Sequence, residues 1–146
     1  MLKNIKWIAL GILLGFLPTL LMSGANRLSP SLTAAAMAAE PAAFTDAAFQ
    51  AAQQAGKPIL IHVNASWCPT CAQQRPILGQ LEQSAELSDL VVFTVDFDSQ
   101  KDVLREFNVQ QQSTLIVFHG MTEKGRATGI TDPAAIHDLL MLAKQS

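Results

Sequence analysis

The sequence predicts an α/β domain in which helices flank a central mixed sheet. Three apolar stretches rich in β-branched residues, at 58–64, 91–96 and 114–119, have the length and composition of buried strands. Stretches with helix start signals alternate with them, and a hairpin and a helix follow the last one. This order is typical of layered α/β folds, and 146 residues with 49% hydrophobic content suit one such domain.

The first half of the domain is predicted to run helix, strand, helix. The pair Thr45-Asp46 can cap a helix over 46–55. The strand over 58–64 follows after a glycine, and a helix is expected from about residue 68 to 84. A short turn containing both cysteines of the chain therefore joins this strand to this helix.

The second half is predicted to add two strands, an edge hairpin and two helices. Asp132-Pro133 supplies a capping residue followed by a proline in the first turn, which is typical of a helix start. The expected order is a strand over 91–96, a helix over 100–107, a strand over 114–119, a turn over 120–125, an edge strand over 126–130 and a helix over 132–142.

The N-terminal stretch has the pattern of a targeting segment. Lys3 and Lys6 precede an apolar run over 7–22, as a positive region precedes the apolar core of an export signal. We therefore divide the chain into a signal peptide or membrane anchor at 1–25, a linker at 26–42 and the folded domain at 43–146. The lysines would keep the N-terminus in the cytoplasm, so the domain is expected in the periplasm.

Cleavage of this segment and its retention are both open. The small residues Ser23-Gly24-Ala25 suit a cleavage site, and those at 36–38 suit one further along. An apolar run of about 16 residues is shorter than the roughly 20 that span a bilayer comfortably. The domain would be soluble after cleavage, or tethered to the inner membrane by residues 7–22.

Charge and cysteine content limit the function classes. The chain has 10 Lys and Arg against 12 Asp and Glu, and Lys3, Lys6 and Arg27 lie in the N-terminal stretch, so the domain is acidic. An acidic domain is not expected to bind nucleic acid. The chain has only two cysteines, which leaves no second dithiol to relay electrons. Any redox activity needs a separate electron donor or acceptor.

The spacing of Cys68 and Cys71 predicts a catalytic dithiol. If Cys68 caps the helix, its sulfur faces the free N–H groups of Thr70 and Cys71, and the helix dipole favours its thiolate. The thiolate is the nucleophile in disulfide exchange. Pro69 suits the first helical position, where its missing N–H costs nothing. Cys71, one turn on, can resolve the mixed disulfide that Cys68 forms.

Other uses of the same pair are weighed against catalysis. A zinc site usually needs four ligands, and His62, His119 and His137 are scattered along the chain. A metal or cluster site would have to be completed by a second copy or a partner. A redox-dependent chaperone or an inert structural pair are further alternatives. The leading interpretation requires no cofactor and no metal ion.

Two stretches resemble the thioredoxin superfamily. They are Lys-Pro-Ile-Leu-Ile at 57–61 and Ala-Ser-Trp-Cys-Pro-Thr-Cys at 65–71, and Pro76 follows the second cysteine at the family's distance. The stretches 95–98 and 114–118 are similar to later family segments. The resemblance covers about residues 44–142. It implies a thioredoxin-like fold and a thiol–disulfide oxidoreductase.

The dipeptide Pro69-Thr70 is similar to that of the membrane-tethered thioredoxins of cytochrome c maturation. That likeness implies a reductase acting on exported protein thiols, supplied by a separate electron donor for which a membrane-bound protein is one candidate. The chain is too short for the insertion typical of that group. The family's substrate-binding surface corresponds here to Trp67, Pro69, Thr70, Ser113 and Thr114.

Ser113 departs from the family pattern. The family has a cis-proline just before the residue that opens the strand at 114–119, and this chain has Ser113 there. A trans bond is expected, because a cis bond before a non-proline residue costs about 2.5 to 4 kcal/mol. We expect Cys68 to be more open to bulky partners or metal without the proline ring. We also expect Ser113→Pro to keep the fold.

His62 is the second departure, because it occupies the place of the family's buried acid beneath the second cysteine. Leu60, His62 and Asn64 are expected on one face of their strand. A neutral imidazole there could take the proton of Cys71, and an imidazolium could stabilise a thiolate. The alternative is a buried histidine that bonds a backbone carbonyl. His119 and His137 are expected at the surface.

Overall fold

The computed structural model describes residues 41–146. The predicted signal or anchor at 1–25 and nearly all of the linker at 26–42 lie outside the described residues. Within 41–146, no helix is both long and apolar enough to cross a bilayer.

The described part of the chain forms one five-stranded mixed sheet. Its order is β1-β3-β2-β4-β5, in which β1, β3 and β2 are parallel and β4 and β5 run antiparallel to their neighbours. The strands are β1 (Ala42–Ala43), β2 (Pro58–Asn64), β3 (Val91–Asp96), β4 (Thr114–His119) and β5 (Thr122–Thr128). The expected strands at 58–64, 91–96 and 114–119 are confirmed.

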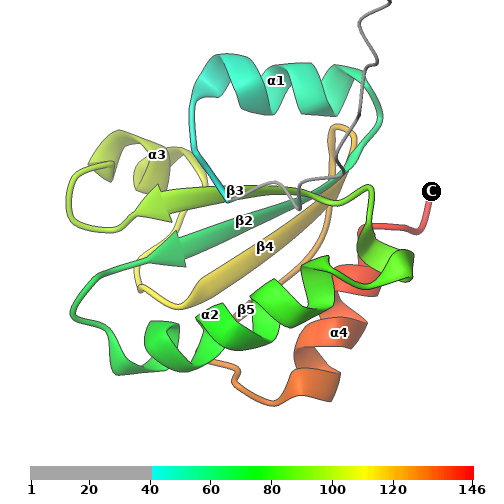
Figure 1. Cartoon of the computed structure of the whole chain (residues 1–146). Coiled ribbons are helices and arrows are strands. Elements are labelled where there is room, and N and C mark those ends of the chain that lie inside the picture. Colours follow the sequence, from blue (N-terminus) through cyan, green and yellow to red (C-terminus); the bar gives the residue numbers. More distant parts are fainter. Residues whose placement is uncertain (1–40) are drawn as a thin grey trace, which may run out of the picture. The chain divides into compact units, whose positions relative to one another are not determined.

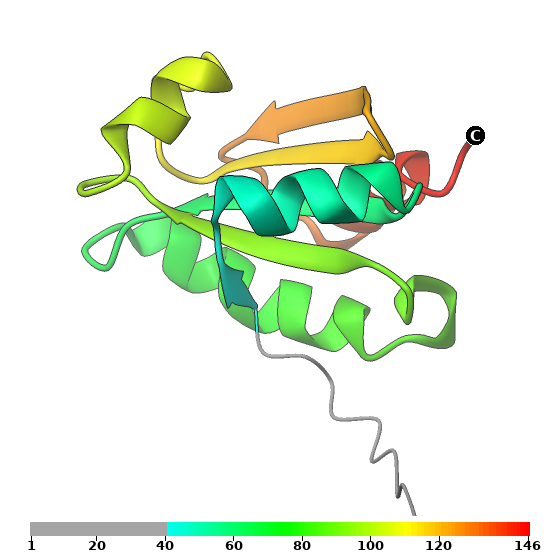
Figure 2. The same cartoon turned by 90° about the horizontal axis from the view of Figure 1, so that it is seen from above.

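Helices cover both faces of the sheet, as predicted. Figures 1 and 2 show α1 and α3 on one face and α2 and α4 on the other. The helices are α1 (Asp46–Gln54), α2 (Pro69–Glu82), α3 (Lys101–Glu106) and α4 (Pro133–Leu142), with a single 3₁₀ turn, η1 (Ala85–Leu87). Thr45 caps α1 and Asp132 caps α4 through their side-chain oxygens, as the sequence indicated.

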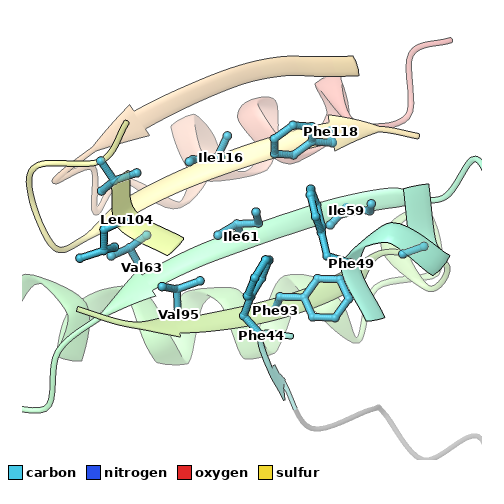
Figure 3. Packing of buried hydrophobic residues seen from close by; sticks show 12 residues of the cluster. Phe44, Phe49, Ile59, Ile61, Val63, Phe93, Val95, Leu104, Ile116 and Phe118 are labelled. Carbon is cyan, nitrogen blue, oxygen red and sulfur yellow. The ribbon is translucent and has the colours of Figure 1, made fainter. Parts of the chain in front are cut away.

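Successive side chains of β2 point alternately into the two hydrophobic cores, one on each face of the sheet. Ile59, Ile61 and Val63 point into the core under α1 and α3, which Figure 3 shows with its phenylalanines. Leu60 points to the opposite core, under α2 and α4. The even-numbered positions of β2 therefore face α2, and His62 lies on that face.

The topology brings the start of β4 beside the end of β2. The two strands are antiparallel, and Val63 pairs with Thr114. The turn from β2 into α2 and the loop before β4 consequently meet at the same end of these two inner strands (Figure 1). Cys68, Cys71 and Ser113 come from these two segments.

The expected hairpin was placed too far along the chain. His119 pairs with Thr122, so the connection is only Gly120-Met121, and β5 covers most of the predicted turn at 120–125. Gly120 has a φ of +53°, which a glycine adopts at low cost and which permits so short a turn. A register shift between Val117 and Phe118 admits the extra residue.

The strand β1 was not expected. It consists of two exposed alanines that pair with Phe93 and Thr94 at the edge of the sheet. Two alanines carry no β-strand pattern, so neighbouring β3 supplies the only reason for this strand to form.

Candidate active site

Cys68 caps α2, as its position in the sequence predicted. Its backbone is extended, with φ −80° and ψ 114°, and Pro69 is the first helical residue. The Cys68 Sγ accepts a hydrogen bond of 3.0 Å from the backbone N–H of Cys71. The sulfur thus lies at the positive end of the helix, where negative charge is stabilised.

Hydrogen bonds favour the thiolate of Cys68. Burial raises the pKa of this thiol, but donors from the Cys71 thiol, the Ser113 hydroxyl and the backbone N–H groups of Cys71 and Thr70 outweigh it. The net effect is a pKa below the usual value of a cysteine thiol. Cys68 therefore presents more of the nucleophilic thiolate at neutral pH than an ordinary cysteine does.

Both cysteines are free thiols and both are buried. Cys68 is 2% exposed and Cys71 is 0% exposed, in a small cluster with Ala65. Cys71 lies one turn further into α2 and is closed to solvent. This arrangement suits attack by Cys68 and resolution by Cys71.

The Ser113 hydroxyl lies against both sulfurs. Its Oγ is 3.1 Å from Cys68 Sγ and 3.4 Å from Cys71 Sγ. Our expectation that loss of the proline ring opens Cys68 is therefore wrong, because the serine side chain is itself buried against the pair. No peptide bond within 41–146 is cis, so the bond before Ser113 is trans, as expected.

The backbone of Ser113 excludes a proline. Its φ is +61°, and its N–H donates to the carbonyl of Val63 at 2.9 Å. Proline requires a φ near −65° and has no N–H. Ser113→Pro would therefore break this bond and force the loop to rearrange, a cost that our expectation of an unchanged fold did not include.

Gln74 is a site residue that sequence reasoning missed. It is fully buried on α2, and its Nε2 donates to the carbonyl of Ser113 at 3.2 Å and to that of Ile130 at 2.9 Å. The Gln74 side chain therefore connects α2 to the loop that contains Ser113. Gln74 lies three residues after Cys71 and four before Leu78, and this spacing places all three on the buried face of α2 and could have revealed it.

His62 is buried on the face of β2 that α2 covers, as expected, but makes no hydrogen bond to either sulfur among the described residues. Burial lowers its pKa to about 4, although the nearby Gln74 side chain acts in the opposite direction. The imidazole is therefore neutral at pH 7, which contradicts the imidazolium role. Neither His62 Nε2 nor Gln74 Oε1 has a well-formed hydrogen bond, so the expected carbonyl partner is also absent at Nε2.

A cavity of about 520 Å³ lies on the same face of the sheet. His62 is part of its wall, together with Arg75 and Glu82 of α2 and Thr94 and Asp96 of β3. Neither cysteine contributes to this wall. A proton leaving Cys71 toward His62 would consequently need a carrier such as water.

Trp67, Pro69 and Thr70 form the outer surface beside the dithiol. Trp67 is 58% exposed, and its Nε1 donates to Asp98 Oδ2 at 2.8 Å. Pro69 is exposed and Thr70 half-buried. A protein that brings a disulfide to Cys68 would meet these residues first. Asp98, which orients the indole, is a second residue that the sequence did not single out.

Thr114 is turned into the fold. It is 3% exposed, and its hydroxyl bonds the carbonyl of Gln111 at 2.8 Å and the hydroxyl of Thr128 at 2.9 Å. The side chain joins the loop to β5. Any contact of Thr114 with a substrate is thus left to its backbone.

The other histidines lie away from the dithiol. His119 Nδ1 contacts the carbonyl of Ala143 at 2.8 Å, and His137 Nε2 lies 3.1 Å from Glu86 Oε2 on the α4 side. Both are half-buried. Across residues 41–146, no three His, Cys, Asp or Glu side chains are grouped so that they could hold a metal ion.

The site is a pair of thiols at the start of α2, beside the loop that precedes β4, and hydrogen bonds stabilise the thiolate of Cys68. This arrangement defines a protein-disulfide oxidoreductase. The Thioredoxin family model matches residues 40–141. The chain belongs to the thioredoxin family.

Individual relatives agree with this class. The chain is 30% identical over 95 residues to the thioredoxin H-type of Fagopyrum esculentum, covering 65% of this chain and 80% of that protein. It is 32% identical over 109 residues to the bifunctional thioredoxin reductase/thioredoxin of Mycobacterium leprae, covering 74% of this chain but only 24% of that protein. The crystal structure of Trxlp from Edwardsiella tarda is 44% identical with a TM-score of 0.68, and the match covers 69% of this chain and 98% of that one.

Proposed function

We propose that this protein reduces disulfide bonds in exported proteins. Cys68 attacks the substrate disulfide, and Cys71 then attacks the mixed disulfide and releases the substrate in its reduced form. The observation that carries the proposal is the position of Cys68 Sγ, which accepts from the N–H of Cys71 at 3.0 Å and lies beside the Ser113 hydroxyl. These donors favour the attacking thiolate.

The surroundings of the dithiol support a protein as substrate. Both sulfurs are buried, so a substrate has to dock before exchange can occur. The exposed Trp67 ring and Pro69 offer an apolar rim for that docking. Residues 41–146 contain no further cysteine, and a separate donor must therefore return electrons to the pair.

The direction of transfer and the location rest on the sequence. The dipeptide Pro69-Thr70 is similar to that of periplasmic reductases, and the pattern of residues 1–25 is that of an export signal or anchor. We place the domain in the periplasm and its electron donor in the membrane. A relative from Mycobacterium leprae is named as a thioredoxin reductase joined to a thioredoxin, and this supports a reductant as the partner.

Turnover of insulin disulfides by the purified full chain tests the activity. Dithiothreitol supplies electrons, and precipitation of reduced insulin reports the rate. We expect the protein to accelerate reduction at substoichiometric amounts, and Cys68→Ser to return the rate to that of dithiothreitol alone. A wild-type protein that adds nothing to the dithiothreitol rate would refute the reductase proposal.

Protease accessibility tests the location separately. The full chain is expressed in a bacterial host, and spheroplasts are treated with protease before lysis. We expect digestion of the domain in intact spheroplasts, and protection when residues 1–25 are deleted. Protection of the full chain would refute export without affecting the redox activity.

A further inference from the structure

One hydroxyl group reaches both sulfurs of the dithiol. Ser113 Oγ lies 3.1 Å from Cys68 Sγ and 3.4 Å from Cys71 Sγ, and the serine is only 3% exposed. A thiolate has no proton to donate, so toward an ionised cysteine the serine must be the donor. Hydrogen bonds to a charged acceptor are stronger than neutral ones.

The backbone holds this hydroxyl in place. Ser113 has a φ of +61°, and its N–H donates to Val63 at 2.9 Å. Its carbonyl accepts from Gly129 N–H at 3.0 Å and from Gln74 Nε2 at 3.2 Å. A residue other than glycine is disfavoured at such a φ by about 1 to 2 kcal/mol, and these three bonds offset that cost. The strained position directs the side chain at the sulfurs.

We propose that Ser113 is a catalytic residue whose hydroxyl donates in turn to the two sulfurs, first to the Cys68 thiolate and then to Cys71 as Cys71 attacks. This role rests on the proposed function, because it needs the pair to exchange disulfides. The hydroxyl has one proton and can donate to one sulfur at a time. Because Ser113 Oγ lies at a similar distance from both sulfurs, rotation about its Cβ–Oγ bond is enough to turn the O–H from one sulfur to the other.

The two steps balance without another group. In the first, the Cys68 thiolate bonds one sulfur of the substrate disulfide, and the other substrate sulfur leaves with the electron pair. In the second, Cys71 bonds Cys68, and the Cys68–substrate bond breaks as the second substrate sulfur leaves. The substrate gains two electrons and the pair becomes a disulfide. The proton of Cys71 ends on a released substrate thiolate, and Ser113 keeps its own.

Two variants of the full chain test the role of the hydroxyl. Ser113→Ala and Ser113→Gly both remove the O–H, but glycine accepts the φ of +61° without strain. An effect shared by both comes from the hydroxyl, and glycine keeps the test valid if the alanine variant does not fold. Ser88→Ala is the matched control, since Ser88 is exposed and bonds only the carbonyl of Ala85.

Each half of the proposal has its own measurement. The rate of Cys68 alkylation by iodoacetamide at pH 6 reports its thiolate, and release of a fluorescent peptide from a preformed Cys68 mixed disulfide reports resolution. We expect both rates to fall about tenfold in the two variants, since a donor to a thiolate is worth about 1.4 kcal/mol or more. Ser88→Ala should match the parent.

Two results overturn the proposal. Alkylation within twofold of the parent in both variants would show that the hydroxyl does not stabilise the thiolate. Slowed alkylation with normal peptide release would refute the change of acceptor. Neither measurement depends on the direction of electron flow, so a parent protein that failed to reduce insulin would refute the proposed function alone.

Discussion

Ser113 donates its backbone N–H to the carbonyl of Val63 at 2.9 Å, and this bond ties the loop before β4 to the strand that leads to the cysteines. The two residues are neighbours because β4 runs antiparallel to β2. The bond lies just outside the paired strands, next to the last pair, Val63 with Thr114. It therefore holds Ser113 over the dithiol from the end of the central strand.

Ser113→Pro should destabilise the protein. Proline removes the N–H that bonds Val63 and cannot adopt the φ of +61°. We expect the free energy of unfolding to fall by more than about 2 kcal/mol. Urea denaturation followed by circular dichroism measures it. Ser113→Gly is the control, and it should stay within about 1 kcal/mol of the parent because glycine accepts this backbone.

A proline variant as stable as the parent would contradict this account of the loop. Such a result would mean that the loop can move to a negative φ without cost. In that case Ser113→Gly would be less stable than Ser113→Pro, because glycine increases the conformational entropy of the unfolded chain and proline decreases it.

Cys68→Ser should abolish disulfide exchange, and Cys71→Ser should accumulate mixed disulfides with its substrates. Cys68 has the stabilised thiolate, while Cys71 is fully buried and acts only after Cys68 has reacted. Non-reducing gels of cells expressing the full-length variants show the trapped species. Equal trapping by both variants, or equal alkylation of both thiols in the parent, would refute the division of roles.

His62 should make the protein less stable as the pH falls from about 6.5 to about 4. Burial lowers the pKa of His62 to about 4 in the folded chain, while the unfolded chain retains a value near 6.5. The unfolded state binds the proton first, so the loss begins below 6.5 and is complete near 4. It amounts to about 3 kcal/mol. His62→Gln should flatten this part of the stability profile, measured by urea denaturation at each pH.

His137→Gln provides a control of opposite sign. A hydrogen bond to Glu86 raises the pKa of His137 above its usual value. Its contribution to stability is therefore present at low pH and is lost as the pH rises through that raised pKa. The effect is small because Glu86 is exposed and His137 is partly exposed, so solvent screens the pair. An unchanged acid slope in His62→Gln would mean that His62 is not the buried neutral group described here.

Gln74→Leu should lower stability and also slow the alkylation of Cys68. The substitution leaves the carbonyl of Ile130 without its donor and loosens Ser113 over the sulfurs. We expect a loss of about 2 kcal/mol in the free energy of unfolding. Gln83→Leu at the C-cap of the same helix is the matched control, because the Gln83 side chain is exposed and bonds only Gly79. A purely structural role for Gln74 would leave the alkylation rate unchanged.

The sequence predicted the parts of the fold that depend on local pattern. The caps at Thr45 and Asp132 and the start of α2 at Cys68 follow from side chains that lie within three residues of the groups they bond. The sulfur position of Cys68 was predictable for the same reason. The three apolar strands were predictable because each is buried along its whole length or on one face.

The features that were missed or placed wrongly depend on contacts across the fold. Ser113 takes its φ of +61° because Val63, Gly129 and Gln74 hold it, and these residues are distant in sequence. We expected an open Cys68 because we assumed that serine, in place of the family's proline, leaves space beside the sulfurs. The strand β1 and the short hairpin likewise depend on pairing with β3 and β4.

The reduction potential of the Cys68–Cys71 pair tests the central claim most directly. The full chain is equilibrated in dithiothreitol buffers of known potential, and the fraction of free thiols is counted after alkylation. We predict a value of about −270 mV, at which the pair donates electrons to the strained, exposed or catalytic disulfides that have higher potentials. A value near about −120 mV would make the protein an oxidant and would contradict its proposed role as a reductase.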